Sequence, residues 1–91
     1  MADQVEITTS DMHSILDLET NQRINPARDI SIGDKVWIGQ RAMILKGAKI
    51  GRGSVIGASA IVSGEVPENC VAAGNPARVI RQKISWDMRI L

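Results

Sequence analysis

The sequence predicts an all-β protein whose chain winds as a parallel β-helix. An isoleucine or valine recurs at every sixth residue from Ile32 to Pro67, beginning with the block "IGDKVW" and ending with "VSGEVP". A period of six fits neither an α-helix, which repeats every 3.6 residues, nor a strand, which repeats every 2. Hexapeptide repeats are typical of β-helices, in which each block supplies a short strand and a turn.

The composition agrees with this architecture. Trp37 and Trp86 are the only aromatic residues, so the core must be built from Ile, Val and Ala, which suits thin stacked layers. The eight glycines lie mostly in the middle of the chain, and an amphipathic helix would not tolerate this glycine density. A β-hairpin would need alternation along whole strands and explicit two-residue turns.

The repeat also predicts which residues stack. Three blocks form one turn of a triangular prism, so Ile32 lies beneath Ile50, and the repeat holds about two of the two to three turns expected in all. The first residue of each block should point inward: Ile32, Ile38, Ile44, Ile50, Ile56 and Val62. The fifth is small or β-branched and should fit a tight corner: Val36, Ala42, Ala48, Ser54, Ala60 and Val66.

The segments around the repeat complete a single expected domain, residues 1–91. "VEITTSDMHSI", which starts at Val5, should be another strand-rich turn, and residues 16–29 should form a loop because they are polar and contain Asn25-Pro26. Residues 68–91 leave the repeat through two prolines and a glycine. The final "ISWDMRIL" fits a strand and a helical turn equally well.

Charge and residue counts exclude several classes of protein. The net charge of +1 favours neither a nucleic-acid partner nor an acidic one. One cysteine and one histidine cannot form an internal disulfide or a zinc cluster, so no metal is expected. No apolar stretch is long enough for a membrane span, and the N-terminus lacks a signal-peptide pattern. We therefore expect a cytoplasmic protein that does not insert into membranes.

Two segments beside the repeat carry a resemblance to a known family. "SDMHSI", residues 10–15, and "NCVAAGNPARVIR", residues 69–81, resemble motifs of the hexapeptide-repeat acyltransferases, in the branch of sugar and polysaccharide O-acetyltransferases. The resemblance extends over residues 7–83. It implies that the parallel β-helix is left-handed, and that an acetyl group moves from acetyl-CoA to a hydroxyl of a sugar or glycan. An amine acceptor remains possible.

The resemblance assigns His13 as the general base that removes the proton of the acceptor. Histidine suits this role because its ordinary pKa is close to neutral pH. A lone histidine without this setting would more often be a surface residue with no catalytic role. Asp11 either orients the imidazole or caps a turn.

The same resemblance implies a binding site for CoA. Gln40 and Ala58 should stack on one edge of the prism beside the pantetheine arm, and the two arginines should hold CoA phosphates, although charge alone fits a solvated tail equally well. The family commonly has Thr-Lys where this chain has Ser63-Gly64, so a lysine is missing. Trp37 lies beside the groove in the family, but it could equally serve packing. The implied cofactor-binding residues are Gln40, Ala58, Ser63, Gly64, Arg78 and Arg81.

Cys70 stands where the family usually has serine, and a structural thiol is expected there. Typical family members are about twice as long and supply acceptor-binding residues from additional N-terminal turns. The alternative is therefore a non-catalytic trimeric β-helix remnant or a fragment of a longer acetyltransferase. A γ-class carbonic anhydrase, which shares the repeat, would need three histidines as metal ligands, and this chain has one.

A homotrimer with its active site between subunits is the expected assembly. The residue before each inward position should point outward. Trp37 stacks with Val55 on one face and Met43 with Ile61 on the next, whereas Lys49 and Pro67 occupy the third. Two apolar faces meeting around a three-fold axis would bury each other, and family members form trimers of this kind.

Overall fold

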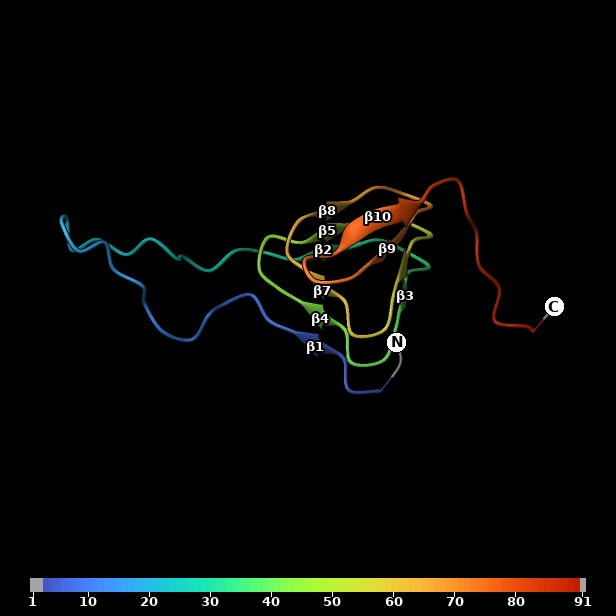
Figure 1. The fold of residues 1–91 in the computed structure, drawn as a ribbon, viewed down its shortest axis with the longest axis horizontal. Helices are drawn as coiled ribbons and strands as arrows, with labels where there is room; N and C mark the ends of the chain where they lie inside the picture. The colour runs from blue at the N-terminus through green and yellow to red at the C-terminus, as the bar shows by residue number, and fades with distance from the viewer. Residues whose placement is uncertain (1–2, 91) are drawn as a thin grey trace.

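The computed structural model describes residues 3–90 and is built from short strands (Figure 1). Within this range the chain forms no helix, and therefore none that could cross a membrane. The strands are β1 (Glu6–Ile7), β2 (Ser31–Ile32), β3 (Trp37–Ile38), β4 (Met43–Ile44), β5 (Lys49–Ile50), β6 (Val55–Ile56), β7 (Ile61–Val62), β8 (Glu65–Val66), β9 (Val71–Ala73) and β10 (Arg78–Arg81).

The strands stack into three parallel sheets that form the three faces of a prism. Their orders are β1-β4-β7, β2-β5-β8 and β3-β6-β9, with β10 added antiparallel to β9 at the end of the third sheet. Trp37 pairs with Val55 and Met43 with Ile61, as a stacking period of 18 requires. The predicted parallel β-helix is confirmed by this pairing.

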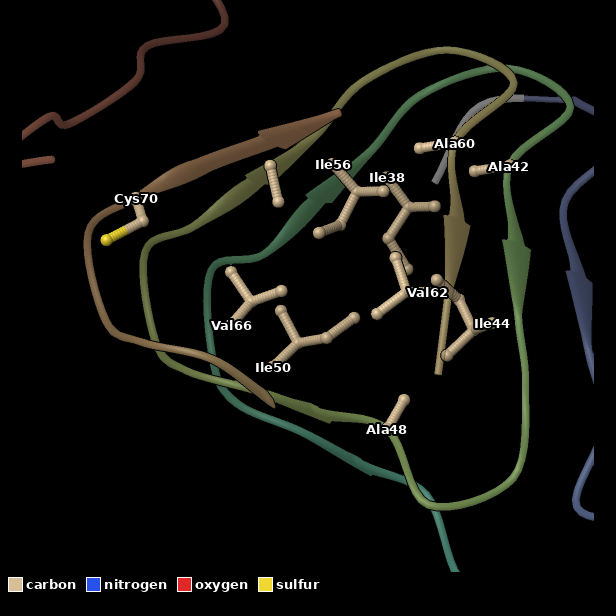
Figure 2. Close-up of a cluster of buried hydrophobic side chains, with 11 residues drawn as sticks. Ile38, Ala42, Ile44, Ala48, Ile50, Ile56, Ala60, Val62, Val66 and Cys70 are labelled. Atoms are coloured by element: carbon tan, nitrogen blue, oxygen red, sulfur yellow. The ribbon is translucent and has the colours of Figure 1, made fainter. Parts of the chain in front are cut away.

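The core fills the centre of the prism, and Figure 2 looks down its axis. Ile38, Ile44 and Ile56 point inward and are at most 1% exposed, whereas Ile32 is 37% exposed because it lies in the first described coil. Small residues occupy the corners, with Ala42 and Ala60 at one and Ala48 at another. The predicted roles of the first and fifth residues of each block are confirmed in these coils.

Close stacking explains why glycine so often follows the inward residue. A Cβ built at Gly51 would lie 2.5 Å from the backbone nitrogen of Glu68 in the next coil. The one polar side chain buried among the corner residues, Ser54, is also accommodated. Its Oγ donates to the carbonyl of Pro67 (2.7 Å) and accepts from the backbone N–H of Cys70 (3.2 Å).

The period of 18 fails in the third coil, and two predictions were wrong there. Ile50 pairs with Val66 and Lys49 with Glu65, a separation of 16 residues. Only residues 63–64 connect β7 to β8, whereas residues 45–48 connect β4 to β5. Val66 is therefore an inward core residue rather than a corner residue. Glu65, and not Pro67, shares the outward column of Lys49.

A long loop, residues 8–30, leaves the prism between β1 and β2 and projects to one side (Figure 1). The predicted strand-rich turn after Val5 was wrong beyond Ile7, because "SDMHSI" belongs to this loop, which is longer than the predicted 16–29. The loop doubles back through an antiparallel bridge between Leu16 and Arg23. At its tip, the carboxylate of Asp17 accepts the backbone N–H groups of residues 19 and 20, which lowers its pKa.

The C-terminal segment after β10 turns back along the prism. Residues 82–90 form neither of the two elements expected for the final residues, a strand or a helical turn. Trp86 instead packs against Trp37, with 5.8 Å between ring centroids, and its Nε1 donates to the carbonyl of Lys35 at 2.9 Å. The Nζ of Lys35 also lies 5.5 Å from the centre of the Trp86 ring. This contact between distant residues fixes the path of the tail.

Candidate active site

His13 lies in the first arm of the loop and is exposed. Its backbone carbonyl accepts a hydrogen bond from the side-chain amide of Asn25 at 2.8 Å. The imidazole ring makes no hydrogen bond to any residue among 3–90, and the residue is exposed. The predicted base therefore has a fixed main chain and a ring that is open to a second molecule.

Asp11 has neither of the roles predicted for it. Its Oδ2 accepts from Nδ2 of Asn25 (2.8 Å) and from Nζ of Lys46 (2.5 Å), so it contacts neither the imidazole nor the backbone of a turn. The lysine hydrogen bond, followed by that of Asn25, lowers the pKa of Asp11. Because Lys46 belongs to the turn between β4 and β5, this ion pair ties the loop to the prism.

Gln40 and Ala58 lie one above the other, as predicted. They occupy equivalent turns, one between β3 and β4 and the other between β6 and β7, and both are exposed. The backbone N–H of Ser59 donates to the carbonyl of Gln40 at 2.9 Å, which locks the two turns together. This corner of the prism offers a small side chain and exposed backbone to a ligand.

Ser63 and Gly64 lie at a different corner. They follow β7, whereas Ala58 precedes it, so the two predicted sets lie at opposite ends of one short strand. The loop that carries His13 leaves from this second corner, because β1 belongs to the same sheet as β7. A Cβ built at Gly64 would meet no atom within 4 Å, so the position is open.

Arg78 and Arg81 project from the same face of β10 because the strand contains an irregularity. Residues three apart on a regular strand point to opposite faces. Here Arg78 is opposite Ala73 and Arg81 is opposite Val71, with a register shift between Val79 and Arg81. Ala73 and Val71 flank the buried Ala72, so both point outward. Cross-strand partners share a face, and both guanidinium groups therefore point outward.

Neither arginine makes a side-chain hydrogen bond or an ion pair with the part of the chain that the structure describes. An outward pair of free guanidinium groups is suited to phosphate oxygens, which the planar donors can hold in pairs. Arg78 directly follows the turn from β9 to β10, whose residue Gly74 accepts the backbone N–H of Ile61 (3.0 Å). The cationic pair therefore begins above the corner that carries Gln40 and Ala58.

Two further side chains were considered from the sequence. Trp37 points outward, is 47% exposed and contacts Trp86, so it lies on the surface rather than in the core. Cys70 is buried, and its Sγ donates to the carbonyl of Glu68 at 3.3 Å, in agreement with a structural thiol. Among residues 3–90, no three His, Cys, Asp or Glu side chains gather closely enough to hold a metal ion.

One residue that sequence reasoning missed is Asn25. The sequence showed it only as part of an Asn-Pro pair that breaks a repeat. The residue is nevertheless only 7% exposed, and its side chain holds the loop around His13. Its burial depends on the doubling back of the loop, which no local pattern reveals. Lys46 was missed for the same reason, since its partners are distant in sequence.

The comparisons with known proteins agree with this fold. Residues 29–64 match the model of the bacterial transferase hexapeptide, with six repeats. The chain carries a hexapeptide-repeat domain of the bacterial transferase type. Its fold is accordingly the left-handed parallel β-helix that the sequence predicted.

The proteins to which the chain is similar include named acetyltransferases. It is 49% identical over 86 residues to the polysialic acid O-acetyltransferase of Escherichia coli O1:K1 / APEC, covering 94% of this chain and 28% of the relative. It is 47% identical over 61 residues to a putative acetyltransferase of Saccharomyces cerevisiae (strain ATCC 204508 / S288c), covering 67% of this chain and 31% of the relative.

Solved structures give the same result. The polysialic acid-specific acetyltransferase NeuO superposes with a TM-score of 0.90 at 46% identity, over 93% of this chain and 36% of that one. The polysialic acid O-acetyltransferase OatWY superposes with a TM-score of 0.95 at 37% identity, over 100% of this chain and 44% of that one. Galactoside acetyltransferase in complex with coenzyme A superposes with a TM-score of 0.72 at 40% identity, over 87% of this chain and 39% of that one. The chain thus spans less than half the length of each of these relatives.

Proposed function

We propose that this chain carries the base and the CoA-binding edge of an acetyl-CoA-dependent O-acetyltransferase that acts on a hydroxyl of a sugar or glycan. His13 is the general base, and the reaction takes place in the cytoplasm. Polysialic acid is the first acceptor to test, because two of the similar solved structures are acetyltransferases of that polymer.

The observation that supports this proposal most is the state of His13. It is the only histidine of the chain, its ring is exposed and unpaired among the described residues, and its main chain is fixed by Asn25. A side chain that only stabilised the loop would contact something in the loop. A general base must instead be free to meet an acceptor held by a second molecule or subunit.

The chemistry needs one group that takes a proton and later returns it. His13 accepts the hydroxyl proton at a ring nitrogen, which leaves the acceptor oxygen free to form a bond to the acetyl carbon. The imidazolium then returns the proton to the departing sulfur. Acetyl-CoA supplies the acetyl group as a thioester, whose carbon–sulfur bond breaks as the new ester bond forms. The neutral imidazole takes the proton in the first step, and the imidazolium that forms gives it up in the second.

The residues of the prism fit the ligand that this reaction needs. Arg78 and Arg81 present two free cations on one face, which suits a phosphate-bearing ligand. Ala58 adds only a methyl group to an exposed corner, so an extended chain can lie close to the backbone there. CoA combines these two features, because its long pantetheine arm ends in a set of phosphates.

A homotrimer would bring the two parts of this site together. The loop of His13 leaves from one corner of the prism, whereas Gln40 and Ala58 lie at another. The loop also exposes large apolar side chains, including Met12 (82%) and Leu18 (102%), as expected of a segment that contacts a neighbour. We propose that His13 of one subunit faces the CoA edge of the next.

The proposed function is tested by mixing the chain with radiolabelled acetyl-CoA and polysialic acid. We expect label to enter the polymer with equal release of CoA. Galactose and maltose serve as other glycan acceptors, and an aminosugar tests the amine alternative. Binding of CoA without transfer to any acceptor would instead favour the alternative of a non-catalytic trimeric remnant.

A further inference from the structure

Asn25 is buried inside a loop that is otherwise open to solvent. The residue is 7% exposed, whereas the neighbouring Ile24 is 60% exposed. Ser54 is the other buried polar residue among 3–90, and it lies in the prism. A polar group is expensive to bury unless its hydrogen bonds are satisfied, so the surroundings of Asn25 must provide partners.

The oxygen and the nitrogen of the Asn25 side-chain amide each make two hydrogen bonds. Oδ1 accepts from the backbone N–H of Ile15 (2.6 Å) and from Nε of Arg23 (3.2 Å). Nδ2 donates to the carbonyl of His13 (2.8 Å) and to Oδ2 of Asp11 (2.8 Å). Of the side chains that fit this volume, only an amide offers an acceptor with two lone pairs and two N–H donors together.

Three of these four bonds reach alternate residues of the arm that carries the base. Asp11, His13 and Ile15 are held at one point, so the main chain of His13 is fixed directly and on both sides. The imidazole takes no part and stays exposed. Asn25 therefore restricts where the ring can be without using either ring nitrogen.

A second link joins this cluster to the rigid prism. Nζ of Lys46 contacts Oδ2 of Asp11 (2.5 Å) and the carbonyl of Pro26 (3.2 Å), one on each arm of the loop. At the base of the loop, the backbone N–H of Arg28 donates to the carbonyl of Thr9 at 3.0 Å. Asn25 and these contacts thus fix the main chain of His13 relative to the β4–β5 turn.

We propose that Asn25 is a positioning residue for His13: its buried amide holds the main chain of the base in place, and turnover depends on that hold. This inference rests on the proposed function. Asn25 does not itself meet the substrate. If Asn25 served only folding, its replacement would lower stability. It would not lower kcat while leaving the affinity for acetyl-CoA unchanged.

The first arm of the test is kinetic. In Asn25→Ala, kcat should fall about 10- to 100-fold, because a displacement of about 1 Å at a reacting group can cost about 100-fold. KM for acetyl-CoA should stay within about twofold, since its proposed contacts lie on the prism. The matched control is Gln22→Ala, which removes an exposed amide of the same loop that makes no side-chain hydrogen bond among the described residues. Its kinetics should equal those of the wild type.

The second arm is nuclear magnetic resonance and needs no acceptor. The backbone order parameters of residues 11–15 should fall from about 0.85 in the wild type to below about 0.6 in Asn25→Ala, while those of the core strands stay unchanged. The single histidine gives one imidazole signal, so its line shape reports the same loss without ambiguity. Gln22→Ala should change neither measurement.

The outcomes separate this inference from the proposed function. Unchanged order parameters in Asn25→Ala, or an unchanged kcat in an active enzyme, would overturn the positioning role. If the order parameters fall as expected but the wild type transfers no acetyl group, the proposed function fails, and the dependence of turnover on Asn25 fails with it. The predicted fall in both quantities, with KM preserved, would support both statements.

Discussion

Nζ of Lys46 lies 2.5 Å from Oδ2 of Asp11, 35 residues away in sequence, and this ion pair connects the prism to the loop that carries His13. The contact is partly exposed, so its contribution to stability is small. Its main effect is geometric, because it holds the first arm of the loop against the β4–β5 turn.

The ion pair predicts a dependence on pH. Lys46 and Asn25 lower the pKa of Asp11 below its ordinary value of 3.8. The stabilisation of the loop is therefore complete above that value and is lost as the pH falls through the lowered pKa, when the carboxylate is protonated. We expect the carboxyl carbon signal of Asp11 to titrate below pH 3.8, and its midpoint to rise in Lys46→Met. Lys49→Met, at an exposed lysine on another face, is the control. Equal midpoints in all three proteins would show that the ion pair does not form in solution.

The arginine pair predicts selective recognition of phosphate. Arg78→Ala and Arg81→Ala should each weaken the binding of CoA by about 10- to 100-fold, since a charge-assisted hydrogen bond contributes about 1.5–3 kcal/mol. The loss should be smaller for dephospho-CoA if one arginine holds the 3′-phosphate. Isothermal titration calorimetry measures both ligands. Arg52→Ala, which removes an exposed arginine between β5 and β6, should bind like the wild type. Equal losses for the two ligands would mean that neither arginine contacts that phosphate.

The open position at Gly64 predicts a gain of affinity. A side chain there meets no atom of the described chain within 4 Å of its Cβ, and the family commonly has lysine at this point. Gly64→Lys should raise the affinity for CoA by up to about fivefold, because an exposed ion pair contributes about 0.2–1 kcal/mol. Gly64→Gln, similar in reach but uncharged, separates charge from bulk. If both variants bind CoA like the wild type, the second corner does not contact the phosphates.

The outward columns predict the surface of the trimer. Met43 and Ile61 form a column on one face, and a charge placed there would be buried at an interface at high cost. Met43→Glu and Ile61→Glu should each reduce the mass measured by light scattering from three chains to one. Glu65→Lys, on the face that already carries Lys49, should leave a trimer. A wild-type chain that is monomeric at micromolar concentration would refute the assembly.

The six-residue period predicted most of the prism because each block makes its own strand and turn. It failed at residues 63–64, where "VSGEVP" keeps a valine at both its first and fifth positions. Val66 can therefore serve as the inward residue two positions before the six-residue period requires one. The sequence pattern does not distinguish a two-residue connection between strands from the usual four-residue one. The register of Ile50 with Val66 follows from stacking in three dimensions.

The candidate site was predictable only where it follows a local motif. His13 and the two arginines stand in recognisable segments, but the bulge that aligns Arg78 with Arg81 depends on pairing with β9. Asn25, Lys46 and Trp86 act through contacts between residues far apart in sequence. Composition and spacing carry no information about such contacts, so only the folded chain reveals them.

The central claim is that His13 is the base of an acetyl transfer, and one comparison tests it most directly. Acetyl transfer from acetyl-CoA to polysialic acid is measured for the wild type and for His13→Ala, with CoA affinity measured on the same samples. Loss of a general base typically costs about 100- to 10,000-fold, so we expect kcat to fall by that amount while CoA affinity stays within twofold. A His13→Ala variant that retains full turnover would contradict the account.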